Sequence, residues 1–133
     1  MILVDSSIWI DHFRNSDATL VELLNRRMVL SHPFVVGEIA LGRLRRRELV
    51  LGELQALPAA KVASDLEVLY FIREHELWGL GIGYVDVHLL AAVQLTPGAS
   101  IWTRDKRLLA VADRLAVAAT LLDKPNGSEP RQR

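Results

Sequence analysis

Short apolar runs alternate along the chain with longer segments in which apolar residues recur at helical spacing. The short runs predict strands at residues 2–4, 28–31, 60–64, 100–105 and 117–122. The longer segments predict helices at residues 6–14, 17–27, 33–47, 48–57, 64–77, 83–95 and 106–115. Pro33 suits the start of a helix, and Ser64 followed by Glu67 has capping-box spacing. This alternation predicts an α/β fold, a parallel sheet with helices on both faces.

Length and composition predict one domain with a short tail. The chain has 133 residues, and half of them are hydrophobic. We assign residues 1–123 to the domain and expect residues 124–133, rich in Pro, Gly, Ser and charge, to be disordered. The absence of cysteine excludes disulfides and thiolate metal sites. Without a long apolar run or a signal peptide, we expect a cytoplasmic protein that makes no use of a membrane.

Charge is balanced overall but uneven along the chain. The 16 basic and 16 acidic residues give a formal net charge of zero, so there is no global attraction to nucleic acid. Residues 43–47, RLRRR, nevertheless place four arginines in five positions. Two interpretations remain open for them, a solvated helix end or a phosphate-binding patch.

Two carboxylates lie at the carboxyl ends of predicted strands. Asp5 comes after "ILV", and Asp105 comes after "IWTR". Ligands of open α/β sheets bind beyond the carboxyl ends of the strands. If these two strands are neighbours, both carboxylates lie at the same edge of the sheet.

Two further acids interrupt apolar helices. Asp86 shares a helix face with Leu89, Leu90 and Val93, and it lies in the first turn, where the helix dipole favours an anion. Glu38 lies within "PFVVGEIALG", and no basic residue stands three or four positions away on its C-terminal side. We therefore expect both acids to be partly buried, and either paired, protonated or bound to a metal.

The four acids together suggest metal chemistry. They are separated by 33, 48 and 19 residues, and each one alone could be a helix cap or half of an ion pair. If they converge, two charges about 5 Å apart repel by roughly 3 kcal/mol at an effective dielectric constant of about 20. Oxygen ligands without cysteine favour Mg²⁺ or Mn²⁺. Such a site suits phosphodiester cleavage.

Four segments carry a family resemblance: "ILVDSSIWIDHF", "VVGEIALG", "GYVDVHLLAA" and "IWTRDKRL". In this order and at these spacings they resemble the four motifs of PIN-domain ribonucleases, and more narrowly the VapC toxins of toxin–antitoxin operons. The resemblance spans residues 2 to about 122. It implies a three-layer α/β/α fold whose parallel sheet has about five strands in the order 3-2-1-4-5.

The resemblance also implies a metal-dependent endoribonuclease. Asp5, Asp86 and Asp105 match the metal-binding acids, and Glu38 matches the acid of the second motif. Ser6 and Ser7 fill the hydroxyl position after the first acid, and Thr103 fits the "T-x-D" pattern before Asp105, so Ser7 and Thr103 are candidate supports of the metal ligands. No side chain is an obvious general base, so water activated by Mg²⁺ or Mn²⁺ is the expected nucleophile.

The expected partners follow from the same resemblance. They are an RNA substrate, a VapB-type antitoxin that blocks the acidic site, and a second copy of the chain in a homodimer, with a heterotetramer or larger complex once the antitoxin binds. The segment 65–78, "DLEVLYFIREHELW", carries more apolar surface than one small sheet needs. This surface either supports the homodimer or completes the core of a single chain.

Three rival functions fit less well. A receiver domain needs an acidic pair near Asp5 and a phosphoacceptor after the third strand, and a phosphatase of the DxD type needs an acid at position 7; residues 6 and 7 are serines. The third alternative is a non-catalytic RNA- or protein-binding module on the same fold. It differs from the enzyme in predicting no metal-dependent turnover.

Overall fold

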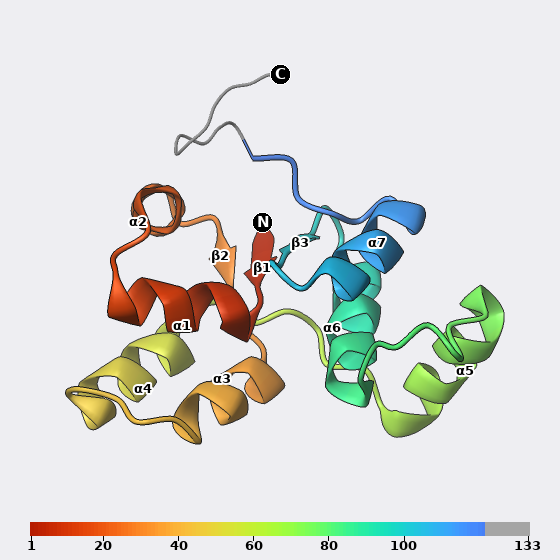
Figure 1. Cartoon of the computed structure of the whole chain (residues 1–133), viewed down its shortest axis with the longest axis horizontal. Helices are drawn as coiled ribbons and strands as arrows, with labels where there is room; N and C mark the ends of the chain where they lie inside the picture. The colour runs from red at the N-terminus through yellow and green to blue at the C-terminus, as the bar shows by residue number, and fades with distance from the viewer. Residues whose placement is uncertain (122–133) are drawn as a thin grey trace.

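Three short parallel strands form the centre of the molecule (Figure 1). The computed structural model describes residues 1–121. The strands are β1 (Ile2–Val4), β2 (Val29–Leu30) and β3 (Ser100–Trp102). The helices are α1 (Ser6–Arg14), α2 (Ala18–Asn25), α3 (Pro33–Ala40), α4 (Arg47–Ala56), α5 (Asp65–His75), α6 (Tyr84–Leu95) and α7 (Lys106–Arg114).

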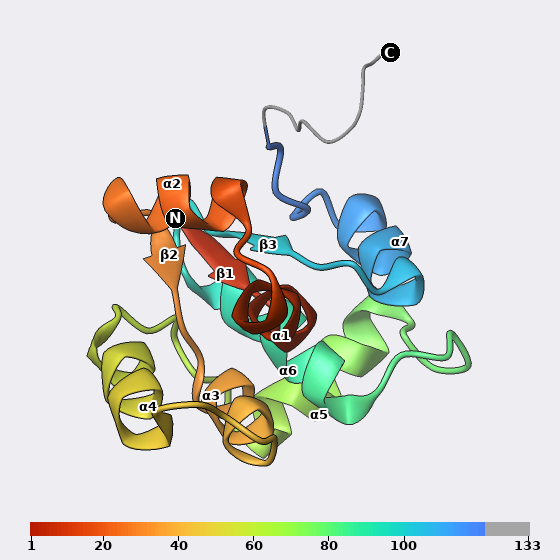
Figure 2. The same ribbon diagram turned by 60° about the vertical axis from the view of Figure 1, so that its left-hand side comes forward.

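The sheet lies between two groups of helices, as the α/β prediction requires. Helices α1 to α4 gather on one side of the sheet, and α5 to α7 gather on the other (Figures 1 and 2). The strands are short but deeply buried: Leu3, Val4 and Ile101 have no exposed surface. Seven of the twelve residues of α6, residues 87–93, are buried as well, in keeping with its apolar sequence. None of the helices among residues 1–121 combines the length and apolar character needed to cross a bilayer.

The strand order places β1 in the middle, with β2 on one side and β3 on the other. In the predicted order 3-2-1-4-5, strand 1 lies between strands 2 and 4, which are β2 and β3 in the structure. The predicted arrangement of these three central strands is therefore confirmed. In the parallel β1–β3 pair, Leu3 lies opposite Ile101 and Val4 lies opposite Trp102. Because the two strands end side by side, Asp5 and the segment that leads to Asp105 leave the sheet at the same edge.

The expected count of about five strands is not confirmed, since three strands occur within residues 1–121. The flanking segments make only single parallel bridges, Ser31 with Ala59 and Ile101 with Ala118. No strand forms at 60–64, where the Lys61 N–H bonds to the Thr96 hydroxyl at 2.9 Å instead of to a neighbouring strand. The predicted tail, 124–133, lies outside the described residues.

The predicted helix 33–47 is also too long. Helix α3 ends at Ala40, and the backbone N–H of Gly42 bonds to the Ile39 carbonyl in the turn that follows. The next helix begins at Arg47, after Arg46 in a left-handed conformation with φ 52°. The arginine cluster therefore occupies a connection between two helices and the start of α4, rather than the end of one long helix.

Candidate active site

Asp5 lies at the junction between β1 and α1, and it is the most buried of the four acids, at 5% exposure. Its Oδ1 accepts a hydrogen bond from the Ser6 backbone N–H at 2.8 Å, which caps α1. Its Oδ2 accepts hydrogen bonds from the Ser7 hydroxyl at 2.9 Å and the Thr103 hydroxyl at 2.7 Å. Ser7 and Thr103 thus both contact the carboxylate that they were predicted to support.

Asp105 caps α7 in a similar way. Its Oδ1 accepts hydrogen bonds from the backbone N–H groups of Arg107 and Leu108 at 2.9 and 3.0 Å. Its own N–H donates to the Thr103 hydroxyl at 3.0 Å. Thr103 therefore connects the Asp5 carboxylate to the backbone of Asp105, which fixes the two strand ends relative to each other.

Asp86 lies in the first turn of α6, where its Oδ2 accepts a hydrogen bond from the Gly83 N–H at 3.2 Å. Burial raises the pKa of this carboxyl group. The Gly83 hydrogen bond lowers that pKa, but the negative charges of Asp5, Asp105 and Glu38 raise it further, and the net pKa is above the usual aspartate value of 3.8. This repulsion shows that the acids of all four motifs are electrostatic neighbours.

Glu38 differs from its prediction. It was expected to be partly buried in an apolar helix, but its side chain lies on the exposed face of α3. The prediction was wrong because one side of this apolar helix faces solvent: Val35 and Ile39 are buried, whereas Gly37 and Glu38 are exposed. Glu38 still reaches the site, since its Oε1 accepts a hydrogen bond from the Ser6 hydroxyl at 2.9 Å.

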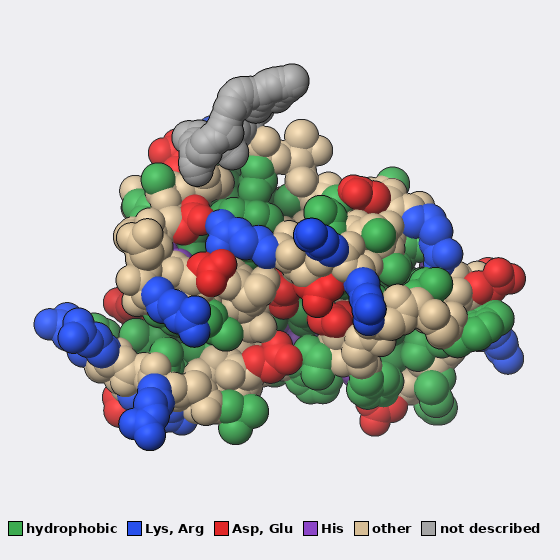
Figure 3. Space-filling model, in the orientation of Figure 1, with side chains coloured by type: hydrophobic (Ala, Val, Ile, Leu, Met, Phe, Trp, Pro, Cys, Tyr) green, Lys and Arg blue, Asp and Glu red, His purple; other side chains and the backbone are tan. Residues whose placement is uncertain are grey.

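Three helix N-termini meet at this edge of the sheet, and an aspartate caps or lies within the first turn of each one. Each of these three aspartates therefore contributes to the start of a helix, as an isolated acid could, and also lies near the other acids. Helix N-termini favour nearby negative charge. Figure 3 shows acidic side chains gathered near the centre of this face, with basic side chains around them.

The four acids have no cationic partner in the described part of the chain: none of its ion pairs includes Asp5, Glu38, Asp86 or Asp105. Over residues 1–121, no three His, Asp or Glu side chains are grouped tightly enough to hold a metal ion as they stand. The donor set nevertheless suits a hard cation, because it consists of carboxylate oxygens whose mutual repulsion a cation would relieve.

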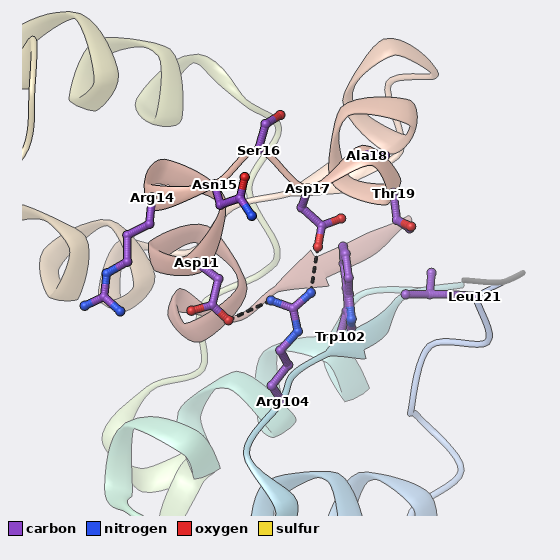
Figure 4. Close-up of a pocket in the computed structure, with 10 residues that line it drawn as sticks. All are labelled: Asp11, Arg14, Asn15, Ser16, Asp17, Ala18, Thr19, Trp102, Arg104 and Leu121. Carbon is purple, nitrogen blue, oxygen red and sulfur yellow. Dashed lines mark hydrogen bonds and ion pairs between the residues drawn. The ribbon is translucent and has the colours of Figure 1, made fainter. Parts of the chain in front are cut away.

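A second, paired acidic cluster lies beside the first. The Arg104 guanidinium contacts Asp11 of α1 at 2.7 Å and Asp17, the N-cap of α2, at 2.6 Å, as Figure 4 shows. The guanidinium also lies 5.8 Å from the centre of the Trp102 ring. These residues line a hollow of about 770 Å³. The backbone N–H of Arg104 reaches the Ser7 hydroxyl at 3.4 Å, so this cluster adjoins the Asp5 support.

Comparison with known proteins identifies the family. The PIN domain family matches residues 2–114. Ribonuclease VapC32 of Mycobacterium tuberculosis (strain CDC 1551 / Oshkosh) is 48% identical over 118 residues, which cover 89% of this chain and 95% of the relative. The protein of the same name from strain ATCC 25618 / H37Rv matches equally well. The chain therefore belongs to the PIN domain family and, within it, to the VapC proteins, which confirms the resemblance seen in its four motifs.

Proposed function

We propose that this protein is an endoribonuclease toxin of a toxin–antitoxin pair. One observation supports this most: four carboxylates from separate elements meet without a cationic partner among residues 1–121, at the edge of a PIN domain. The name of the 48% identical relative, a ribonuclease, agrees with RNA as the substrate.

The proposed cofactor is Mg²⁺ or Mn²⁺. Asp5, Asp86 and Asp105 would hold the ion directly or through water, and Glu38 would complete the acidic cluster. Such an ion supplies positive charge against the phosphate and activates water at neutral pH.

The side chains of this protein have definite tasks in that scheme. Ser7 and Thr103 fix the Asp5 carboxylate by holding its Oδ2. Ser6 ties Glu38 of α3 to the start of α1. Since the pKa of Asp86 is raised, protons compete with a cation for this carboxylate.

The proposed partners are an antitoxin and a second copy of the chain. Helix α5 and the loop after it expose Leu66 (79%), Leu69 (56%), Tyr70 (57%) and Trp78 (63%), the kind of apolar surface that a homodimer buries. We infer a two-fold homodimer that acts in the cytoplasm and forms a heterotetramer or larger complex with a VapB-type antitoxin. Light scattering at tens of micromolar tests the dimer, and a strict monomer would refute it.

A cleavage assay tests the function itself. The purified protein should cut RNA in Mg²⁺ or Mn²⁺, stop in excess chelator, and be inhibited when its VapB-type antitoxin is co-expressed. If RNA is bound but remains intact in both metals, the non-catalytic binding module becomes the better description.

A further inference from the structure

An open groove of about 470 Å³ begins beside the candidate active site. Its walls come from α1, the C-terminal part of α3, the connection that follows α3, and α4. Glu38 is one of the lining residues, so the groove is continuous with the acidic cluster. Arg14, Arg43 and Arg45 line it as well.

These arginines are not neutralised within the described part of the chain. Arg14, Arg43 and Arg45 are all exposed, and none of them forms an ion pair with residues 1–121. The neighbouring Arg46 and Arg47 are also exposed and form no ion pair there. Arg104, on the other side of α1, has two carboxylate partners. The cationic charge of the groove is therefore available to a ligand, whereas that of Arg104 is already used.

Apolar side chains lie between the cations. Phe13 and Ile10 line the groove with 37% and 40% of their surfaces exposed. The Phe13 ring is stacked against Trp9, which fixes its orientation. A cationic groove with an exposed aromatic ring is the arrangement that binds single-stranded nucleic acid, since the cations contact phosphates and the ring stacks on a base.

An anionic substrate needs such a surface here. The acidic cluster repels phosphates, and the net charge of zero provides no long-range attraction. Basic side chains do gather on the same face of the molecule, at the lower left in Figure 3, near the end of α1 and the connection between α3 and α4.

We propose that this groove binds the single-stranded RNA next to the cleaved bond, with Arg14, Arg43 and Arg45 on its phosphates and Phe13 beneath a base. The inference rests on the proposed ribonuclease function and adds a substrate track to it. The paired Arg104 has no part in this track.

The test is RNA binding without cleavage. A fluorescein-labelled 20-nucleotide RNA of mixed sequence is titrated in chelator, where the proposed enzyme is inactive, and the affinity is followed against salt. The triple variant R14Q/R43Q/R45Q should bind about tenfold more weakly at low salt, and its salt slope should fall by about 2, since each phosphate contact on a single strand contributes about 0.7. The lysine variant R43K/R45K should keep the wild-type slope.

The control is R26Q/R27Q, which removes two charges after the end of α2, outside the groove. Its slope should be that of the wild type. An equal loss in this control would overturn the proposal, because the effect would then belong to total charge. An unchanged salt slope in the triple variant would also overturn the proposal. If that variant in addition no longer forms a complex with its VapB-type antitoxin, the groove binds a protein partner instead of RNA.

The cleavage assay separates the two proposals. In Mg²⁺ the triple variant should show a raised KM with kcat nearly unchanged, because its residues lie outside the acidic cluster. If the wild type binds RNA with the expected slope but cleaves none, the proposed enzyme fails and the groove proposal stands. If the wild type cleaves RNA and the triple variant has an unchanged KM, only the groove proposal fails.

Discussion

Two acidic clusters lie next to each other in this fold, and they use their charge differently. Asp11 and Asp17 hold the Arg104 guanidinium, so that cluster contains its own counterion. Burial would raise the pKa of Asp17, but hydrogen bonds from the Leu20 N–H and Arg104 outweigh burial and lower it. In the other cluster the pKa of Asp86 is raised, by burial first and then by other carboxylates.

The difference separates a cluster that stabilises the fold from the cluster that we propose binds a cation. A paired cluster lowers the energy of the folded chain by itself, and it ties α1 and α2 to the segment after β3. Repulsion within an unpaired cluster lowers the stability of the folded chain until a cation binds to it. Repulsion of this kind is expected where function, rather than stability, has selected the residues.

The largest expected effect is on catalysis. D5N or D86N should lower RNA cleavage about 1,000-fold, a loss of roughly 4 kcal/mol of transition-state stabilisation, because each variant keeps its shape but loses the charge that holds the cation. The measurement is the rate of RNA cleavage in Mg²⁺, with circular dichroism to verify folding. D11N, which changes the paired cluster, is the control and should remain within about threefold of the wild type. Wild-type rates from D5N would disprove the assignment.

The second effect is on the stability that comes from the paired cluster. R104Q should lower the free energy of unfolding by about 1–2 kcal/mol, because Asp17 is only 17% exposed and would remain beside Asp11 without a cation. R26Q is the matched control, since the Arg26–Glu22 pair is 3.7 Å long and both side chains are more than 60% exposed; its loss should stay below about 0.5 kcal/mol. Urea denaturation compares the two variants, and equal losses would mean that the Arg104 pairs are ordinary surface contacts.

The smallest effect is a pH dependence of opposite sign in the two clusters. The pKa of Asp86 is raised in the folded state, so its stabilising contribution is present below about pH 3.8 and is lost as pH rises through the folded pKa. The pKa of Asp17 is lowered, so its contribution is present above about pH 3.8 and is lost as pH falls through the folded pKa.

Two variants measure this contrast in chelator at pH 7. D86N should melt about 2–3 °C above the wild type, a small gain because the partly exposed group is screened by water. D17N should melt a few degrees below the wild type. If both variants shift the melting temperature in the same direction, the two clusters do not differ as described.

Sequence patterns predicted the elements in which local signals are strong. β1 and α6 were recognised from their apolar runs, and α5 from Ser64 and Glu67, which form the capping box in the structure. The meeting of Asp5 with Asp105 was predicted on the condition that their strands are neighbours, and the family resemblance implied that they are. These features depend on residues close in sequence or on one general property of parallel sheets.

The remaining features depend on contacts between distant residues. Arg104 bonds to carboxylates 93 and 87 positions away, which no local pattern indicates. The segment after Ala59 is apolar enough for a strand. However, the Lys61 N–H donates its hydrogen bond to the Thr96 hydroxyl, 35 positions away. Glu38 was expected to be partly buried, because its sequence neighbours are apolar and the solvent-facing side of α3 is set by tertiary packing.

The central claim is that the unpaired cluster receives a divalent cation, and a thermal melt in chelator against about 5 mM Mn²⁺ tests it most directly. A site filled to about ten times its dissociation constant stabilises the folded state by roughly 1.4 kcal/mol, so the wild type should melt about 5 °C higher in Mn²⁺. D5N and D86N should lose this shift, and D11N in the paired cluster should keep it. A wild-type melting temperature that is unchanged by Mn²⁺, or a shift that survives in D5N and D86N, would contradict the account.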